Sequence, residues 1–279
     1  MTMNVIQIDR LTRDYGGGKG VFDLSFDVGR GEAFGFLGPN GAGKTTTIRH
    51  LMGFLKAASG TCAIGGMDCW RDRERIQARL GYIPGEISFF SDMTGAEFLR
   101  FAASYRGMTS SQRQRELLER FELDPRGKIN RMSKGMKQKL GIVAAFMHDP
   151  DILILDEPTS GLDPLMQSRF IDLITEEKRR GKTILLSSHL FEEVERTCDR
   201  VGIIRQGRLA AVDAVDALRQ RHVRPYTVTL DSEAIARDFA RDFGGTQKGL
   251  TVTVTARQSL EDIFMHYYGG ETNDERSAL

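Results

Sequence analysis

The sequence predicts an α/β protein built around a parallel sheet, with a small α+β segment at its C-terminal end. The first observation is a glycine-rich loop at residues 38–45, which follows an apolar run and opens a helical pattern. The second is the alternation of short β-rich runs with helical patterns over residues 151–204, which implies right-handed crossovers between parallel strands. The third is a change of composition after Arg224-Pro225, where runs rich in Thr and Val follow.

Several short segments before and after the loop at 38–45 are expected to form strands. Two runs alternate apolar and polar side chains, which is typical of half-exposed strands, and a glycine-rich turn at 15–20 separates them. The run just before the loop is apolar throughout, which predicts a buried strand. The expected strands are 4–9, 21–28, 32–37, around 62–64 and 81–83, and a helix is expected at 46–52.

Helical patterns dominate the middle of the chain. Thr94 and Glu97 have the spacing of a capping box, which predicts a helix start, and Asp149-Pro150 ends a later helix. The expected helices are about 94–121, with a break near 107–110, and 134–148; the expected strands are 151–155, 183–187 and 200–204. We expect one domain at 1–222, with a helical subdomain at about 88–148, and a small α+β domain at 223–279.

Composition excludes some classes of function. The 39 Lys and Arg nearly balance the 38 Asp and Glu, which argues against a nucleic-acid binder with a broad basic face. The three cysteines have no metal-ligand or redox spacing, so isolated thiols in a reducing cytoplasm are expected rather than a metal site. No apolar run approaches the roughly 20 residues that a membrane span needs. If the chain works at a membrane, another protein must hold it there.

The glycine-rich loop fits the pattern of a phosphate-binding P-loop. Glycines let consecutive backbone N–H groups turn towards phosphate oxygens, and the following helix N-terminus adds partial positive charge. Lys44 is expected to reach the β- and γ-phosphates, and the Thr45 hydroxyl can ligate Mg²⁺. The residues expected to bind a nucleoside triphosphate here are Gly38, Pro39, Asn40, Gly41, Ala42, Gly43, Lys44, Thr45 and Thr46.

Two acidic residues, Asp156 and Glu157, follow a second apolar run. Carboxylates at the end of a buried strand are costly unless a cation or a reaction uses them. With a P-loop upstream, Asp156 is placed to hold Mg²⁺ and Glu157 to deprotonate an attacking water. Taken alone, such a pair is more often a helix cap or a solvated turn.

These motifs, in this order, resemble the ATP-binding subunits of ABC transporters over roughly residues 4–220. The resemblance implies an N-terminal antiparallel β subdomain, a RecA-like parallel-sheet core and a helical subdomain. It also implies that the chain binds and hydrolyses ATP with Mg²⁺. In the family two such chains sandwich two ATP molecules head to tail and drive a separate membrane permease. A homodimer at the cytoplasmic face of the membrane is therefore expected, with no nucleic-acid partner.

The resemblance assigns roles to the matching residues. Glu157 is the catalytic base beside the phosphate-binding Lys44, and Asp156 holds Mg²⁺ together with Thr45. His189 matches the switch histidine that senses the γ-phosphate, although a lone His there is otherwise more often a cap or a core residue. Tyr15 matches the aromatic that stacks on adenine, although it is equally explained as a hairpin residue. The D-loop positions are Ser160, Gly161, Leu162 and Asp163.

The signature and the Q-loop depart from the family's pattern. The signature that contacts ATP in the other subunit is Ser133, Lys134, Gly135 and Met136, where the family usually has Ser-Gly-Gly-Gln. The glutamine expected in the Q-loop is replaced by Gly85, and Glu86 follows. A glycine has no side chain to contact Mg²⁺ or water, so Glu86 is a candidate substitute.

The branch of the family is indicated by residues 133–139 and 259–264, which are similar to ABC-2-type drug and antibiotic exporters. Phe89, Phe90 and Met93 lie where a helix of the permease docks in the family, although both phenylalanines could instead be core residues. The transported substrate is read by the permease and no residue here names it. Alternatives are a soluble ABC ATPase acting on ribosomes or DNA, a GTPase switch, which lacks its guanine-reading motif here, and an inactive regulatory subunit, which the intact Lys44 and Glu157 argue against.

Overall fold

The computed structural model describes residues 4–221, 223–257, 260, 261, 263 and 265. The expected helix at the very end of the chain and the polar tail lie largely outside these residues. The backbone divides into two compact units, residues 1–212 and residues 213–279. The domain boundary expected at 222/223 stays a prediction.

The first unit contains two sheets with a helix between them. The larger sheet has the strand order β10-β9-β3-β8-β7-β6, and β9, β3, β8, β7 and β6 pair in parallel. The smaller sheet is antiparallel with the order β2-β1-β4-β5. The strands are β1 (Asn4–Gly16), β2 (Lys19–Gly29), β3 (Ala33–Leu37), β4 (Ser59–Ile64), β5 (Met67–Asp68), β6 (Leu80–Ile83), β7 (Ile152–Asp156), β8 (Thr183–Ser188), β9 (Arg200–Arg205) and β10 (Arg208–Ala214).

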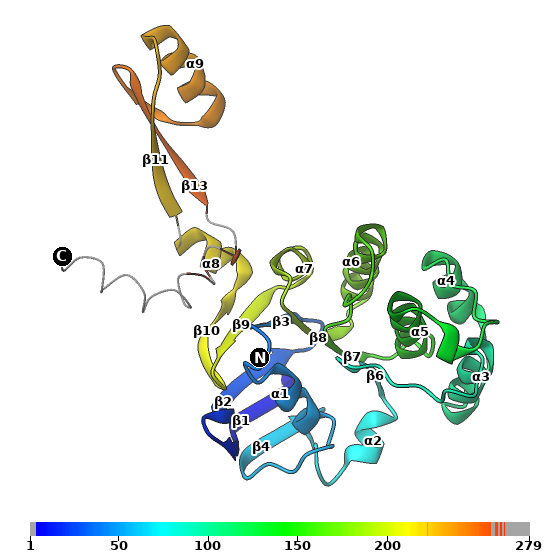
Figure 1. The fold of residues 1–279 in the computed structure, drawn as a ribbon. Helices are drawn as coiled ribbons and strands as arrows, with labels where there is room; N and C mark the ends of the chain where they lie inside the picture. Colours follow the sequence, from blue (N-terminus) through cyan, green and yellow to red (C-terminus); the bar gives the residue numbers. More distant parts are fainter. Residues whose placement is uncertain (1–3, 222, 258–259, 262, 264, 266–279) are drawn as a thin grey trace. The chain divides into compact units, whose positions relative to one another are not determined.

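Apolar side chains of both sheets form one core around the first helix. Phe26 of the smaller sheet stacks on Phe34 of the larger one, with ring centroids 5.0 Å apart, and Ile48 and Leu51 are fully buried between the sheets. Helices α6 and α7 cover the other face of the larger sheet, and α3, α4 and α5 lie beyond its β6 edge (Figure 1). The helices are α1 (Lys44–Leu51), α2 (Arg73–Gln77), α3 (Gly95–Tyr105), α4 (Gln112–Arg120), a 3₁₀ turn (Ile129–Arg131), α5 (Lys134–Phe146), α6 (Pro164–Arg179) and α7 (Phe191–Thr197).

Helix boundaries follow the capping signals in the sequence. Thr94 and Glu97 form the expected capping box at the start of α3. Asp163 caps α6 by accepting the Met166 N–H, and Pro164 occupies the first helical position. The expected fold class is confirmed, and α3 begins at the expected capping box. Helix α1 begins at Lys44, two residues earlier than expected, and β1 and β2 extend further into the glycine-rich turn.

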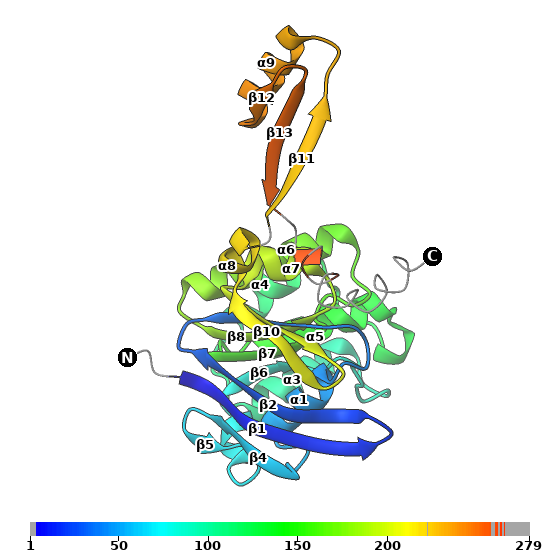
Figure 2. The same ribbon diagram turned by 90° about the vertical axis from the view of Figure 1, so that its left-hand side faces the viewer.

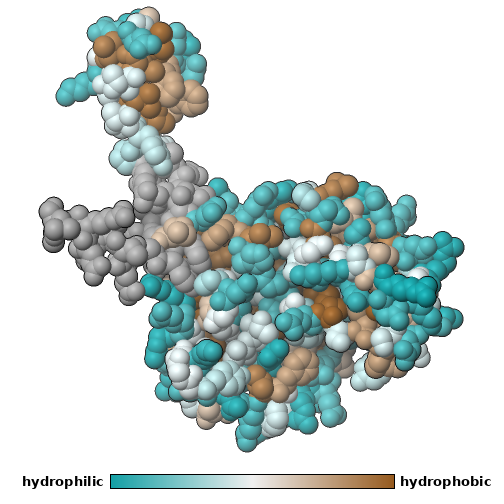
Figure 3. Space-filling view, in the orientation of Figure 1, coloured by the Kyte–Doolittle hydropathy of each residue, from teal (hydrophilic) through white to brown (hydrophobic). Residues whose placement is uncertain are grey.

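The second unit is a three-stranded antiparallel sheet of order β11-β13-β12, with α9 packed beside β12 and β13 (Figure 2). Its elements are α8 (Val215–Arg221), β11 (Val223–Thr229), α9 (Glu233–Phe243), β12 (Thr246–Lys248) and β13 (Thr251–Arg257). Figure 3 shows apolar side chains gathered on the surface of this unit, whereas the visible face of the first unit is largely hydrophilic. Its exposed large apolar residues include Tyr226, Ile235, Phe243 and Leu250.

Candidate active site

Three neighbouring parallel strands bring the candidate site together. Strands β3, β8 and β7 lie side by side in the larger sheet, so the loops at their carboxyl ends meet at one edge. The P-loop follows β3, Asp156 ends β7 with Glu157 directly after it, and His189 follows β8. Ligands of open α/β sheets bind at this edge. Residues far apart in sequence are therefore joined by strand order.

The P-loop is held tightly against the smaller sheet. Gly43 caps α1 with a φ of +116°, and a Cβ built there would lie 2.9 Å from a methyl carbon of Val21. Only glycine combines that backbone with so close an approach. The Thr47 hydroxyl donates to the Gly43 carbonyl at 2.9 Å, which fixes the first turn of the helix. The loop therefore presents its backbone at the N-terminus of α1.

Lys44 is buried within this loop, with 5% of its surface exposed. Its ammonium donates to the carbonyls of Gly38, at 2.6 Å, and Pro39, at 3.2 Å. It also forms an ion pair with Glu157, with Nζ 3.1 Å from Oε1. Lys44 thus joins the P-loop to the carboxylate after β7.

Asp156 is fully buried, and its two carboxylate oxygens differ in their hydrogen bonding. Its Oδ1 accepts a hydrogen bond from the Ser187 hydroxyl, whereas its Oδ2 is buried and has no hydrogen-bond partner among the residues that the structure describes. A Cβ built on Gly85 would lie 2.9 Å from this Oδ2. Glycine at the Q-loop position therefore keeps space open beside the free oxygen. An orphaned carboxylate oxygen fits a site that takes up a cation.

Glu157 adopts the left-handed region, with φ at +49°, which is uncommon for a residue with a side chain. Its N–H donates to the Ser187 carbonyl at 3.1 Å, which holds this conformation. The carboxylate contacts Lys44 through Oε1 and His189 Nδ1 through Oε2. The structure therefore brings together the three residues that the sequence assigned to catalysis.

The signature residues contact the D-loop of the same chain. Ser133 caps α5 by accepting the Met136 N–H at 3.2 Å. The Lys134 ammonium donates to the Ser160 hydroxyl at 2.9 Å, and a Cβ on Gly135 would lie 2.8 Å from the Gly161 carbonyl oxygen. In the part of the chain that the structure describes, Ser133 forms no hydrogen bond with the Lys44–Glu157–His189 cluster.

Tyr15 and Glu86 lie on the surface. Tyr15 lies near the end of β1 with its ring exposed and the Arg13 guanidinium 5.4 Å from the ring centroid. Glu86 is exposed directly after Gly85. The adenine-stacking role of Tyr15 and the Q-loop role of Glu86 both stay predictions.

One buried residue of the site was missed by sequence reasoning. Glu193 of α7 is 2% exposed and accepts a hydrogen bond from the Ser188 hydroxyl at 2.5 Å. Burial, with a smaller contribution from the charge of Glu157, raises the pKa of Glu193 to about 7. In the sequence it is one of several acidic residues of a short helix, and nothing distinguishes it from its exposed neighbour Glu192.

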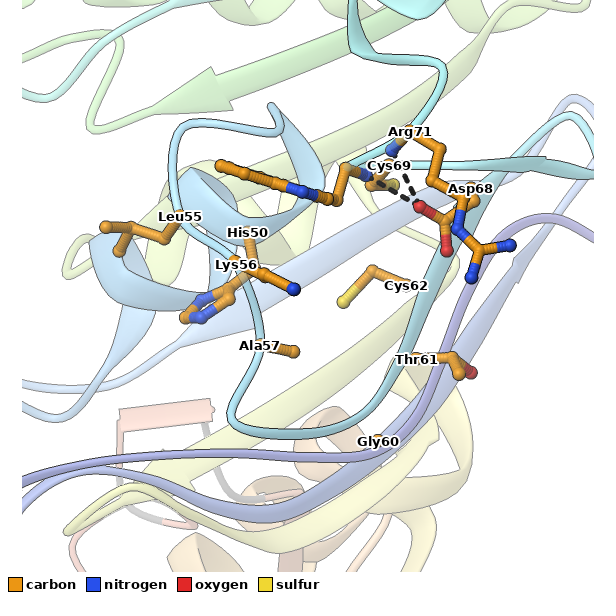
Figure 4. Close-up of a pocket in the computed structure, with 11 residues that line it drawn as sticks. His50, Leu55, Lys56, Ala57, Gly60, Thr61, Cys62, Asp68, Cys69 and Arg71 are labelled. Atoms are coloured by element: carbon orange, nitrogen blue, oxygen red, sulfur yellow. Dashed lines mark hydrogen bonds between the residues drawn. The ribbon is translucent and has the colours of Figure 1, made fainter.

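A separate cavity of about 230 Å³ lies at the other end of α1 (Figure 4). It is lined by His50 in the last turn of that helix, by Cys62 of β4 and by Cys69 just after β5, whose N–H donates to the Cys62 carbonyl at 2.9 Å. Burial raises the pKa of the Cys62 thiol to about 12 and raises that of Cys69 as well, so both thiols stay protonated. The cavity is roughly 9 Å along the helix axis from the phosphate end and is no part of the site.

Comparison with known proteins places this geometry in a family. The model of the ABC transporter family matches residues 21–160, half of the chain. The chain belongs to this family. It is an ATP-binding and ATP-hydrolysing subunit, of the kind that pairs with a second ATPase subunit and a membrane permease.

Relatives with known names support the assignment. The bacitracin transport ATP-binding protein BcrA of Bacillus licheniformis is 40% identical over 221 residues, 78% of this chain and 72% of that protein. The linearmycin resistance ATP-binding protein LnrL of Bacillus subtilis is 38% identical over 213 residues, 75% of this chain and 68% of that protein. A solved structure of an ATP-binding subunit of an ABC transporter has a TM-score of 0.75 and 30% identity, and the match covers 95% of this chain and 99% of that one. Within the described residues of this ABC ATPase, no helix is long and apolar enough to cross a membrane.

Proposed function

We propose that two copies of this ABC ATPase bind two ATP molecules between them and hydrolyse them to power export through a separate permease. The observation that carries the proposal is the cluster of Lys44, Glu157 and His189 beside the buried Asp156. In this proposal Lys44 is the phosphate-binding cation, Glu157 the base and His189 the γ-phosphate sensor. All three lie at the carboxyl ends of adjacent strands. That set of groups suits attack of a water on a terminal phosphate.

In the ATP-bound state, the ammonium of Lys44 exchanges its carbonyl and Glu157 contacts for phosphate oxygens, which carry more negative charge. Glu157 is then released to orient and deprotonate the attacking water, and His189 contacts the γ-phosphate. The exposed ring of Tyr15 stacks on the adenine base.

Mg²⁺ is the cation that fits beside Asp156. The buried, unpartnered Oδ2 supplies a hard oxygen ligand, and the Thr45 hydroxyl lies in the first turn of α1. When bound, the ion neutralises charge on the phosphate oxygens.

The second half of each ATP site comes from the signature of the partner copy. Ser133 and the first N–H groups of α5 form a helix N-terminus, which attracts a γ-phosphate. In this proposal the Ser133 end of α5 and the Lys44 cluster of one ATP site belong to different subunits, as the head-to-tail pair of chains in the family implies. A single copy then binds ATP but hydrolyses it poorly.

An aromatic surface beside the Q-loop suits the permease. Phe90, Phe101 and Tyr105 are all exposed, and their rings pack on one another with centroids 5.9 and 6.4 Å apart. Phe89 instead packs on Phe98. An exposed apolar patch of this kind marks a protein interface. Docking there holds the chain at the cytoplasmic face of the membrane, and the names of BcrA and LnrL favour an antibiotic-resistance or related exporter.

A pull-down of the tagged chain from its own cell membranes in mild detergent tests this function. The expected result is a polytopic membrane protein that stimulates ATP hydrolysis, with less of it recovered by the variant Phe90→Ala/Phe101→Ala. Recovery of ribosomal or DNA-repair proteins alone contradicts the exporter and leaves the ATPase standing.

Replacing Glu86 by Ala is expected to lower the permease-stimulated rate of hydrolysis, because Glu86 supplies the polar group that Gly85 lacks. The measurement is phosphate release with and without the recovered permease. Glu119→Ala, which removes an exposed carboxylate from α4, is the matched control. An unchanged stimulated rate in Glu86→Ala clears Glu86 of the Q-loop role.

A further inference from the structure

Glu193 is a buried carboxylate for which the proposed ATP site has no direct use. Its Oε2 accepts a hydrogen bond from the Ser188 hydroxyl, next to His189 in the chain. Its Oε1 is buried and has no hydrogen-bond partner in the described part of the chain. An acid in such surroundings is costly to bury. Val or Leu would fill this side of α7 at lower cost, so the carboxylate calls for an explanation.

Glu193 is linked by hydrogen bonds to the residues on either side of His189. The Ser188 hydroxyl donates to Glu193 at 2.5 Å and accepts the N–H of Leu190 at 2.9 Å. Ser188 and Leu190 are the chain neighbours of His189, so the backbone on both sides of the histidine is tied to one carboxylate. Rotation of the Ser188 side chain, which would release Leu190, is blocked as long as Glu193 accepts its proton.

The same carboxylate also reaches the loop that carries Glu157. The Thr159 hydroxyl lies 3.5 Å from Glu193 Oε2, at the limit of a hydrogen bond. Thr159 lies in the turn after Glu157, where the Ser160 N–H donates to the Glu157 carbonyl at 3.1 Å. One buried oxygen atom therefore contacts both loops whose side chains meet in the Glu157–His189 contact.

We propose that Glu193 is a positioning residue for hydrolysis, which holds Ser188 and Thr159 and thereby sets the contact between His189 and Glu157. The proposal rests on the roles proposed above for those two residues. A base and its partner must be held within a fraction of an ångström for efficient reaction, whereas ATP binding by the P-loop does not depend on this loop. Loss of Glu193 therefore acts on the chemical step.

The test compares Glu193→Ala, Ser188→Ala and the double variant in the full chain. We expect each single variant to lower kcat about tenfold with KM for ATP unchanged. The double variant is expected to lose no more than the worse single one, because both changes break the same chain of hydrogen bonds. Glu193→Gln keeps an oxygen that accepts from Ser188 and is expected to retain most of the wild-type kcat.

The matched control is Glu192→Ala, which removes the exposed neighbouring carboxylate of the same helix. Equilibrium binding of ATP and the unfolding temperature are measured for every variant. If Glu193→Ala does not fold, Ser188→Ala and Glu193→Gln decide the question. Unchanged kcat, losses that add in the double variant, or a rise in KM alone overturns the proposal. His189→Ala is measured in parallel: wild-type hydrolysis by that variant would refute the role of His189 itself, whatever Glu193 does.

Discussion

Replacing Glu157 by Gln is expected to lower kcat for ATP hydrolysis by at least about a hundredfold, because it removes the general base. ATP binding should persist, since Lys44 and the P-loop are unchanged and the amide still fits between Lys44 and His189. The variant should therefore accumulate as an ATP-bound dimer. Phosphate release and sedimentation with Mg-ATP measure the two effects.

The control for Glu157→Gln is Glu192→Gln, which makes the same change on the surface of α7. That control should hydrolyse ATP at the wild-type rate. A Glu157→Gln chain that stays monomeric at saturating Mg-ATP would count against the sandwich of two copies. One that still hydrolyses ATP rapidly would remove Glu157 from the role of base.

Replacing Lys44 by Ala is expected to weaken ATP binding about a hundredfold, because charge-assisted hydrogen bonds to the phosphates are lost. Hydrolysis should fall at least as far, since bound ATP also loses stabilisation of its developing charge. Equilibrium titration with a fluorescent ATP analogue measures the dissociation constant.

Lys248→Ala is the matched control for Lys44→Ala, because Lys248 lies on β12 in the second unit. Its affinity for ATP should equal that of the wild type. The unfolding temperature of Lys44→Ala without nucleotide separates a binding defect from a folding defect, since this lysine also joins the P-loop to Glu157. Wild-type affinity in a folded Lys44→Ala chain would contradict the phosphate-binding role.

The P-loop and the Asp156-Glu157 pair could be predicted from sequence because each is a local pattern. A strand, a glycine-rich loop and a helix follow one another within twenty residues, and the same holds for the apolar strand that ends in two acids. The capping box of α3 was equally local, and it is confirmed.

The side-chain contacts between these motifs could not be predicted from sequence alone, because they depend on the order of the strands in the sheet. Lys44 follows β3 and Glu157 follows β7, and β8 lies between these two strands in the sheet. Glu193 on α7 contacts Thr159 in the turn after β7. The need for glycine at position 85 likewise depends on the three-dimensional structure. A Cβ at this position would crowd the carboxylate of Asp156 on the neighbouring strand.

The central claim is that each ATP site is shared between the P-loop of one copy and the signature of another, and ATP-dependent cross-linking tests it most directly. One chain carries Asn40→Cys in the P-loop and a second, with a tag of different size, carries Met136→Cys beside Ser133. Both carry Glu157→Gln to hold ATP. The native cysteines are buried, so they interfere little. The account predicts a cross-linked product of both chains that forms with Mg-ATP and not without nucleotide. Chains that bind ATP but form no such product, or form it equally without ATP, would contradict the account.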